Sequence, residues 1–179
     1  MPDGIDGVMN MLKERVAQLL NEQINKELFS AYLYLDMANY YADQGLNGFE
    51  NWFKIQAMEE RDHAMLFREY LQNNGHRVTF GAIADPSRDY KSHKAPLEAA
   101  LEHERYVTDS INTIYTEAVA QKDYRTMQFL DWFVKEQGEE EKNAEDNIRK
   151  YELAGERALF MLDHAFASRS YSAPSLHLD

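Results

Sequence analysis

Four glutamates and one histidine lie where a helical protein normally buries only apolar side chains: Glu27, Glu60, His63, Glu104 and Glu140. Each glutamate stands on a stripe of apolar residues that recurs every three or four positions, which is the spacing of a buried helix face. A carboxylate in a protein core costs several kcal/mol unless a partner compensates its charge. These groups therefore need a shared partner.

A metal cation is the partner that the sequence favours. Lys and Arg are missing from the inward positions beside the glutamates, so ion pairing does not supply the compensation. Glu60-x-x-His63 places an oxygen and a nitrogen ligand three residues apart on one face of a helix. Carboxylates with one imidazole and no thiolate suit hard to borderline metals such as iron or manganese. The pattern predicts a site for one or two such ions.

Long helices must hold these residues, because proline is absent from 3–85 and from 97–173. Proline interrupts helices, so both tracts permit long ones. Within them the apolar residues keep helical spacing. We expect helices over about 6–43, 48–74, 95–122 and 124–154, a shorter fifth helix over 157–168 and a loose tail over 170–179.

Residues at the expected helix ends support these boundaries. Asp6, Asn47 and Asp123 carry side-chain oxygens that can accept a hydrogen bond from a helix N-terminus. Gly75 and Gly155 suit the left-handed conformation that commonly ends a helix. Local chemistry and periodicity therefore indicate the same helices.

The connections between the helices limit the topology. The first and second helices, and the third and fourth, are joined by a few residues at most, which makes each pair antiparallel neighbours. The second and third are joined by 75–94, and about twenty extended residues reach roughly 66–72 Å, more than the ~40 Å length of a 27-residue helix. We therefore expect a single all-α domain over 1–179, a four-helix bundle with a long crossover and a short fifth helix. An up-down-up-down bundle with a long loop is the alternative.

The four glutamates lie at one depth of this bundle. The helix midpoints fall near residues 25, 61, 109 and 139, and each glutamate lies within about a turn and a half of its midpoint. Carboxylate-bridged di-metal bundles use one Glu from each of two helices and a Glu-x-x-His from each of the other two. The fourth helix departs from that pattern, because Glu136-Gln-Gly-Glu139-Glu140 contains no histidine.

Each feature taken alone also has a plain structural interpretation. A single Glu beside an apolar stripe usually reaches water, and the acidic run 139–141 is typical of a solvated face. Tyr34 alone is typical of a core tyrosine. His103 is expected at the surface, because its side chain leaves the helix about 100° away from that of Glu104. Only the conjunction of four glutamates at one level favours a metal site.

Composition excludes several other classes of protein. The 31 Asp and Glu residues outnumber the 19 Lys and Arg residues, for a formal net charge of −12, which disfavours nucleic acids and anionic membranes as partners. The absence of cysteine excludes disulfides, zinc fingers and thiol catalysis, and fits a cytoplasmic protein. Every stretch of ten residues contains a charged side chain, so no membrane span is expected. No signal peptide is expected either.

Three segments of the chain resemble those of prokaryotic non-haem ferritins, which are ferritin-like di-iron proteins: 20–28, 58–63 and 136–142. The resemblance covers about residues 10–165 and includes the crossover and the fifth helix. It implies a ferritin-like fold, with Glu27, Glu60 and His63 holding a first iron. Glu60 would bridge to a second iron held by Glu104 and Glu140.

The same resemblance implies roles for residues around the two irons. Gln137 would form a hydrogen bond near the second iron, and Tyr34 corresponds to the tyrosine beside the ferroxidase centre. A third iron site would use Glu59, Glu136 and Glu139.

By resemblance, the protein is a ferroxidase that oxidises Fe(II) with O₂ or peroxide and stores ferric mineral inside a hollow homo-oligomeric shell of twenty-four subunits (a 24-mer). No haem is expected, because Arg61 follows Glu60 where bacterioferritins have methionine, and Glu139 replaces their second histidine. The fifth helix distinguishes the chain from mini-ferritins. The alternatives are a di-iron oxidoreductase without storage, and a non-catalytic helical assembly whose glutamates face water.

Overall fold

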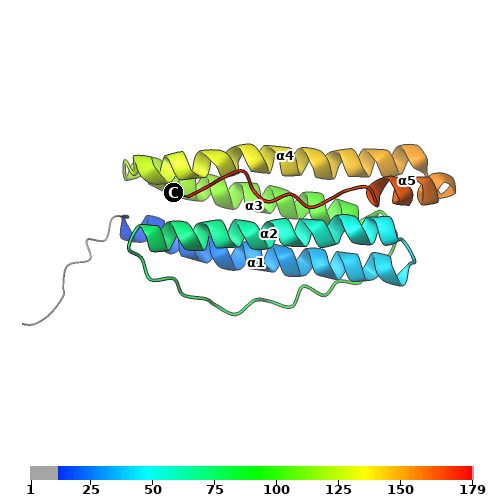
Figure 1. Cartoon of the computed structure of the whole chain (residues 1–179), viewed down its shortest axis with the longest axis horizontal. Coiled ribbons are helices and arrows are strands. Elements are labelled where there is room, and N and C mark those ends of the chain that lie inside the picture. The colour runs from blue at the N-terminus through cyan, green and yellow to red at the C-terminus, as the bar shows by residue number, and fades with distance from the viewer. Residues whose placement is uncertain (1–11, 179) are drawn as a thin grey trace, which may run out of the picture.

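A computed structural model describes residues 12–178, and in that part of the chain it contains five α-helices and no strand. Four long helices lie along one axis, and a short fifth helix packs at one end against α2 and α4 (Figure 1). The bounds are α1 Glu14–Asp43, α2 Asn47–Asn73, α3 Ala95–Ala120, α4 Tyr124–Ala154 and α5 Leu159–Phe166, with a 3₁₀ turn at Glu156–Ala158. None of these helices is long and apolar enough to cross a membrane.

The connection between α2 and α3 is a crossover along the whole bundle. In Figure 1, α2 and α3 run in the same direction, and the segment joining them returns along the length of α1. Asn21 and Asn25 of α1 bond the backbone of this segment at Thr79 and Gly81, and Tyr41 donates to the carbonyl of His93 at 2.6 Å. The expected arrangement is confirmed, and the up-down-up-down alternative is wrong.

Most helix ends agree with their local chemistry. Asp123 accepts from the backbone N–H of Thr126 at 3.1 Å and begins α4. Gly75 and Gly155 follow α2 and α4 with φ of 78° and 62°, values that glycine adopts without strain. The first helix begins at Glu14, and residues 12 and 13 are not helical. The expected start at 6, with Asp6 as its cap, lies outside the described residues.

The N-terminus of α2 is capped by a residue distant in sequence. Asn47 is the first residue of the helix and not its cap. Asp163 of α5 instead accepts from the backbone N–H groups of Gly48 at 2.8 Å and Phe49 at 3.0 Å. A carboxylate at this end of a helix also interacts favourably with the helix dipole. The cap therefore joins α5 to the bundle.

The segment after α5 is not the loose tail that the sequence predicts. It has no regular secondary structure, yet it runs back along the bundle beside α2 and α4 (Figure 1). Ser175 accepts a hydrogen bond from Trp132 Nε1 at 3.0 Å, and Leu176 and Leu178 pack against the core. The segment is ordered because its hydroxyl and apolar groups find partners on helices far away in the sequence.

The buried apolar side chains form two clusters, one towards each end of the bundle. One cluster includes Leu20, Phe67 and Phe133, and the other includes Tyr41 and Phe53. The two clusters are separated by a layer in which every helix of the bundle contributes a buried polar group. This layer holds the candidate site.

A substitution at Gly48 tests how α5 is attached, and a substitution at Gly138, where an added Cβ has free space around it, provides the comparison. A Cβ added at Gly48 would lie 1.7 Å from the carbonyl oxygen of Asp163, whereas a Cβ at Gly138 would meet nothing within 4 Å. We expect Gly48→Ala to lower the free energy of unfolding by about 1–3 kcal/mol, because α5 must move. Gly138→Ala should raise it by about 0.5–1 kcal/mol, because glycine weakens a helix interior.

Urea denaturation of the metal-free protein measures both effects. The close contact between Gly48 and Asp163 would be contradicted if both variants changed the free energy of unfolding equally. It would also be contradicted if Gly48→Ala were as stable as the wild type with α5 still in place.

Candidate metal centre

The bundle brings the five predicted ligands to one level. Glu27 comes from α1, Glu60 and His63 from α2, Glu104 from α3 and Glu140 from α4, and all five side chains are buried. Their helices are held in register by the apolar clusters above and below them. The structure therefore places the carboxylates inside the bundle, as the sequence predicts, and not in water.

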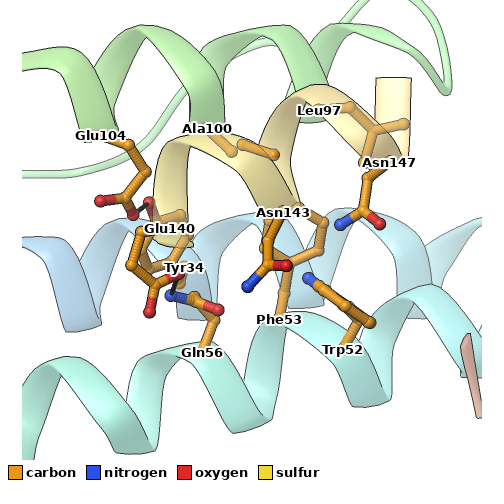
Figure 2. A pocket seen from close by; sticks show the side chains of 11 residues that line it. Tyr34, Trp52, Phe53, Gln56, Leu97, Ala100, Glu104, Glu140, Asn143 and Asn147 are labelled. Atoms are coloured by element: carbon orange, nitrogen blue, oxygen red, sulfur yellow. Dashed lines mark hydrogen bonds between the residues drawn. The ribbon is translucent and has the colours of Figure 1, made fainter. Parts of the chain in front are cut away.

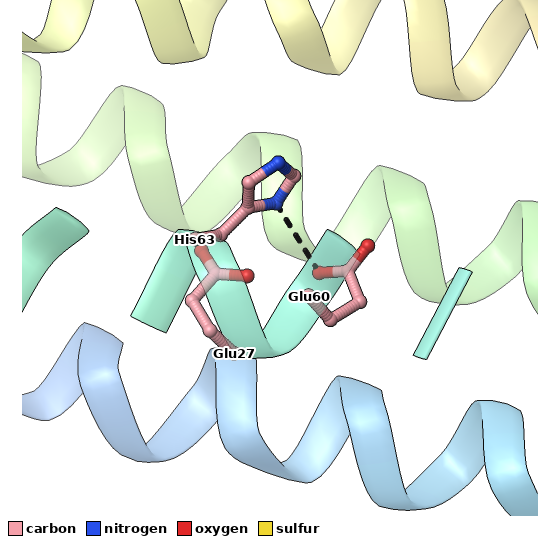
Figure 3. A group of neighbouring side chains, drawn as sticks. All are labelled: Glu27, Glu60 and His63. Atoms are coloured by element: carbon pink, nitrogen blue, oxygen red, sulfur yellow. Dashed lines mark ion pairs between the residues drawn. The ribbon is translucent and has the colours of Figure 1, made fainter. Parts of the chain in front are cut away.

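Glu27, Glu60 and His63 form one half of the centre. One ligand atom from each lies within 4.8 Å of those of the other two, and Figure 3 shows Glu27 reaching from α1 towards Glu60 and His63 of α2. His63 Nδ1 lies 3.6 Å from Glu60 Oε2. The second oxygen of Glu27, Oε2, is buried and has no hydrogen-bond partner. A buried carboxylate oxygen without a donor fits a cation, which would supply the missing interaction.

The other half of the centre holds Glu104 and Glu140 in hydrogen bonds. The hydroxyl of Tyr34 donates to Glu104 Oε1, and Gln137 Nε2 donates to Glu104 Oε2 at 3.1 Å. Gln56 Nε2 donates to Glu140 Oε2 at 2.9 Å and to Glu60 Oε1 at 3.2 Å. Tyr34, Gln56, Glu104 and Glu140 line a common pocket (Figure 2). The volume of this pocket is about 20 Å³. Tyr34 and Gln137 therefore lie beside the centre, where the resemblance places them.

The sequence-based prediction of the site did not include two buried glutamines that bond the candidate ligands. Gln23 and Gln56 each stand four residues before a ligand, so that Gln23 bonds Glu27 at 2.8 Å as Gln56 bonds Glu60. The repeated Gln-x-x-x-Glu spacing, which places both side chains on one helix face, was the available signal.

The orientation of Gln23 is set from outside the centre. Lys26 Nζ donates to Ser110 Oγ at 2.7 Å, and Ser110 donates to Gln23 Oε1 at 2.7 Å. Because an ammonium group can only donate, this chain directs the NH₂ group of Gln23 towards Glu27.

Burial sets the electrostatics of the centre. It raises the pKa of Glu27, Glu60 and Glu140 well above the ordinary value, and neighbouring carboxylates raise each pKa further. Burial also raises the pKa of Glu104 and of Tyr34. Without a cation, the folded chain therefore favours protonated carboxyl groups. A bound cation reverses this preference, because it favours the ionised form.

The three residues expected at a third iron site do not form a cluster of this kind. Glu59 pairs with Arg169, and Glu139 lies 3.4 Å from Lys135 on the exposed face of α4. Glu136 is only partly buried, and burial raises its pKa. Of the described residues, only Glu27, Glu60 and His63 bring three potential metal ligands together within 4.8 Å. A third site over Glu59, Glu136 and Glu139 stays a prediction.

The expectation of a surface position for His103 is wrong. Its side chain is buried, and its Nε2 lies 2.8 Å from Ser30 Oγ on α1. The 100° rotation away from Glu104 turns His103 towards α1 and not towards water, which periodicity on one helix could not decide. Burial lowers the pKa of His103 to about 4. The side chain is therefore a neutral part of the α1–α3 contact.

The stability of the metal-free protein should fall as the pH rises above the ordinary glutamate pKa of 4.5. Each raised pKa means that the folded chain binds more protons than the unfolded chain above the ordinary value of 4.5, so the free energy of unfolding decreases with pH. Glu27→Gln should flatten this dependence, because it removes one buried ionisable group.

Thermal midpoints in the presence of a chelator measure this prediction. Glu102→Gln is the matched control, because Glu102 is exposed on α3 and its loss changes the net charge equally. A midpoint that rises with pH, or the same slope in wild type and Glu27→Gln, would show that the buried carboxylates do not control stability.

The chain is similar in sequence and in fold to known ferritins. Residues 17–154 match the family model described as ferritin-like domain. The chain is 38% identical over 155 residues to a bacterial non-heme ferritin of Campylobacter jejuni, covering 86% of this chain and 93% of the relative. It is 36% identical over 165 residues to a probable bacterial non-heme ferritin-like protein of Haemophilus influenzae, covering 91% and 100%.

Solved structures agree with these sequence relatives. An open-pore ferritin from the hyperthermophilic archaeon Archaeoglobus fulgidus superposes with a TM-score of 0.88 at 41% identity, over 90% of this chain and 100% of that chain. An engineered closed form of the Archaeoglobus fulgidus ferritin gives a TM-score of 0.88 at 40% identity, over 90% and 99%. Because the family model matches most of the chain and relatives at 36–38% identity cover nearly all of it, this chain belongs to the ferritin family and is a prokaryotic non-haem ferritin.

Proposed function

We propose that this protein stores iron by oxidising Fe(II) at the buried carboxylate centre and retaining the ferric product inside a hollow homo-oligomer. The observation that carries the proposal is the convergence of buried ligand atoms of Glu27, Glu60 and His63 within 4.8 Å of one another, together with a Glu27 oxygen that has no hydrogen-bond partner. Relatives named bacterial non-heme ferritin support storage as the outcome. The shell of twenty-four subunits is carried over from the ferritin resemblance.

Two Fe(II) ions are the substrates in this proposal. Glu27, Glu60 and His63 hold the first, and Glu60 bridges to the second, held by Glu104 and Glu140. Each ion gives up one electron, so the pair reduces one O₂ to peroxide with two protons. Carboxylates are hard anions that stabilise Fe(III) more than Fe(II), which drives the oxidation.

The residues around the ligands keep the carboxylates oriented. Tyr34 and Gln137 hold the two oxygens of Glu104, and Gln56 holds Glu140. Burial raises the pKa of Tyr34 well above its ordinary value, so the phenol keeps its proton and remains a donor. The ligands can therefore accept iron with little rearrangement, and the ferric product is released for storage.

The small cavity favours storage over a di-iron oxidoreductase that acts on an organic substrate. The space beside Tyr34, Glu104 and Glu140 measures about 20 Å³, which is the size of one or two small molecules such as water. Pockets for organic ligands are typically about 300–1,000 Å³. Iron and a small oxidant fit this centre, and a metabolite does not.

Loss of the bridging ligand tests the oxidation step. We expect Glu60→Ala, and separately the double variant Glu27→Ala with His63→Ala, to slow the initial rate of Fe(II) oxidation by more than about tenfold, since even outer partners of metal ligands cause losses of that size. Glu102→Ala, an exposed α3 carboxylate, is the control that keeps the wild-type rate. Stopped-flow absorbance under air measures the rate, and fast oxidation in both site variants would refute the site.

Iron loading tests storage separately from oxidation. After aerobic addition of many equivalents of Fe(II), size-exclusion chromatography with iron analysis should find far more iron per chain than the centre can bind, in a large oligomer of unchanged size. A small oligomer with only a few ions per chain would favour a non-storage oxidoreductase. No retained iron would favour the non-catalytic assembly.

A further inference from the structure

The segment 167–178 covers the side of the metal centre between α2 and α4. It starts at the end of α5 and runs along the bundle between these two helices (Figure 1). The hydroxyl of Tyr171 donates to Asp62 on α2, and Ser175 accepts from Trp132 on α4. Trp132 in turn packs edge-on against the ring of His63, with ring centroids 5.6 Å apart. The segment therefore lies directly outside the first half of the centre.

Arg169 of this segment contacts a glutamine that bonds two of the candidate ligands. Its side chain is 15% exposed, and its guanidinium carbon lies 4.2 Å from the centre of the Trp52 ring. Nη1 donates to the carbonyl of Trp52 at 3.1 Å and to Gln56 Oε1 at 2.9 Å, and Nη2 pairs with Glu59. The carbonyl of Arg169 accepts from Asn51 at 3.0 Å. All these partners lie on α2, the helix that carries Glu60 and His63.

The contact with Gln56 fixes the direction of an amide at the centre. A guanidinium group has donors only, so it must face the carbonyl oxygen of Gln56. The NH₂ group of Gln56 is then directed at Glu60 and Glu140, the two carboxylates to which it donates. Without Arg169, the amide can reverse and present an oxygen to those carboxylates.

The contact of Arg169 with Gln56 favours metal binding at the centre, whereas its contact with Glu59 disfavours metal binding at Glu59. Glu59 is 19% exposed and its carboxylate already has a cation, the guanidinium of Arg169. A metal ion that uses Glu59 must therefore compete with a positive charge of the chain itself.

We propose that Arg169 is a positioning residue that strengthens the two-iron centre through Gln56 and withholds Glu59 from a third iron. The proposal rests on the proposed function, because it assigns the control of one site to a residue outside it. A third iron at Glu59, Glu136 and Glu139 binds only after the guanidinium moves away. The segment 167–178 thus sets how many ions the centre holds at low iron.

Titration of the metal-free, full-length protein with Zn²⁺, a redox-inert divalent ion, tests this inference by calorimetry and by counting bound zinc. In Arg169→Ala we expect the tight ions to bind about tenfold more weakly, the usual loss when an outer partner of a ligand is removed. The weakest ion should bind more tightly, because its competitor is gone. Weaker binding of the tight ions together with tighter binding of the weakest ion would indicate a positioning role. General damage to the fold would instead weaken the binding of every ion.

Two further variants separate the contacts. Glu59→Gln keeps Arg169 and Gln56 in place, so it should lose the weakest ion and leave the tight ions unchanged. Arg149→Ala is the charge-matched control, because Arg149 is exposed on α4 and within residues 12–178 its one ion pair is with Asp146. It should not alter any site.

The outcomes also separate this inference from the proposed function. If the wild type binds tight zinc and oxidises Fe(II), but Arg169→Ala leaves all sites unchanged or shifts them in one direction, only the role of Arg169 is refuted. If the wild type binds no zinc and does not oxidise Fe(II), the proposed function itself is refuted.

Discussion

The cost of holding carboxylates in a low-dielectric layer governs this structure. Four glutamates, one from each long helix, interrupt the apolar core, and burial makes their ionised forms unfavourable. The packing of the two apolar clusters opposes that cost and keeps the helices in register. A multivalent cation bound among these carboxylates would favour their ionised forms and so offset this cost.

Amide and hydroxyl donors reduce the cost of burying these carboxylates without adding a positive charge beside them. Gln23, Gln56, Gln137 and Tyr34 each donate to a ligand carboxylate, and none of them brings a charge. Neutral donors orient the oxygens while leaving them available to iron, whereas a lysine at the same place would compete with it. The positive charge of Arg169 lies one contact further out and bonds the amide of Gln56.

The fold and the burial of the candidate ligands at one level could be predicted from the sequence, because both depend on local periodicity. The spacing of apolar residues located the four long helices, and the length of 75–94 favoured the crossover that the structure shows. The position of each glutamate near the middle of its helix located the centre, since helix rise per residue is constant. The same logic failed for His103 and for the C-terminal segment, whose contacts are made with other helices.

The sequence by itself determined which chemical groups the protein has and at what height along each helix they stand. Glu27 and Glu60 share a level because residue number converts directly into distance along a helix. Only the tertiary structure decided how each helix is rotated about its axis, which turned His103 inwards, and where Arg169 meets Glu59. Rotation and long-range contact depend on packing between segments far apart in the chain, and no local pattern encodes that packing.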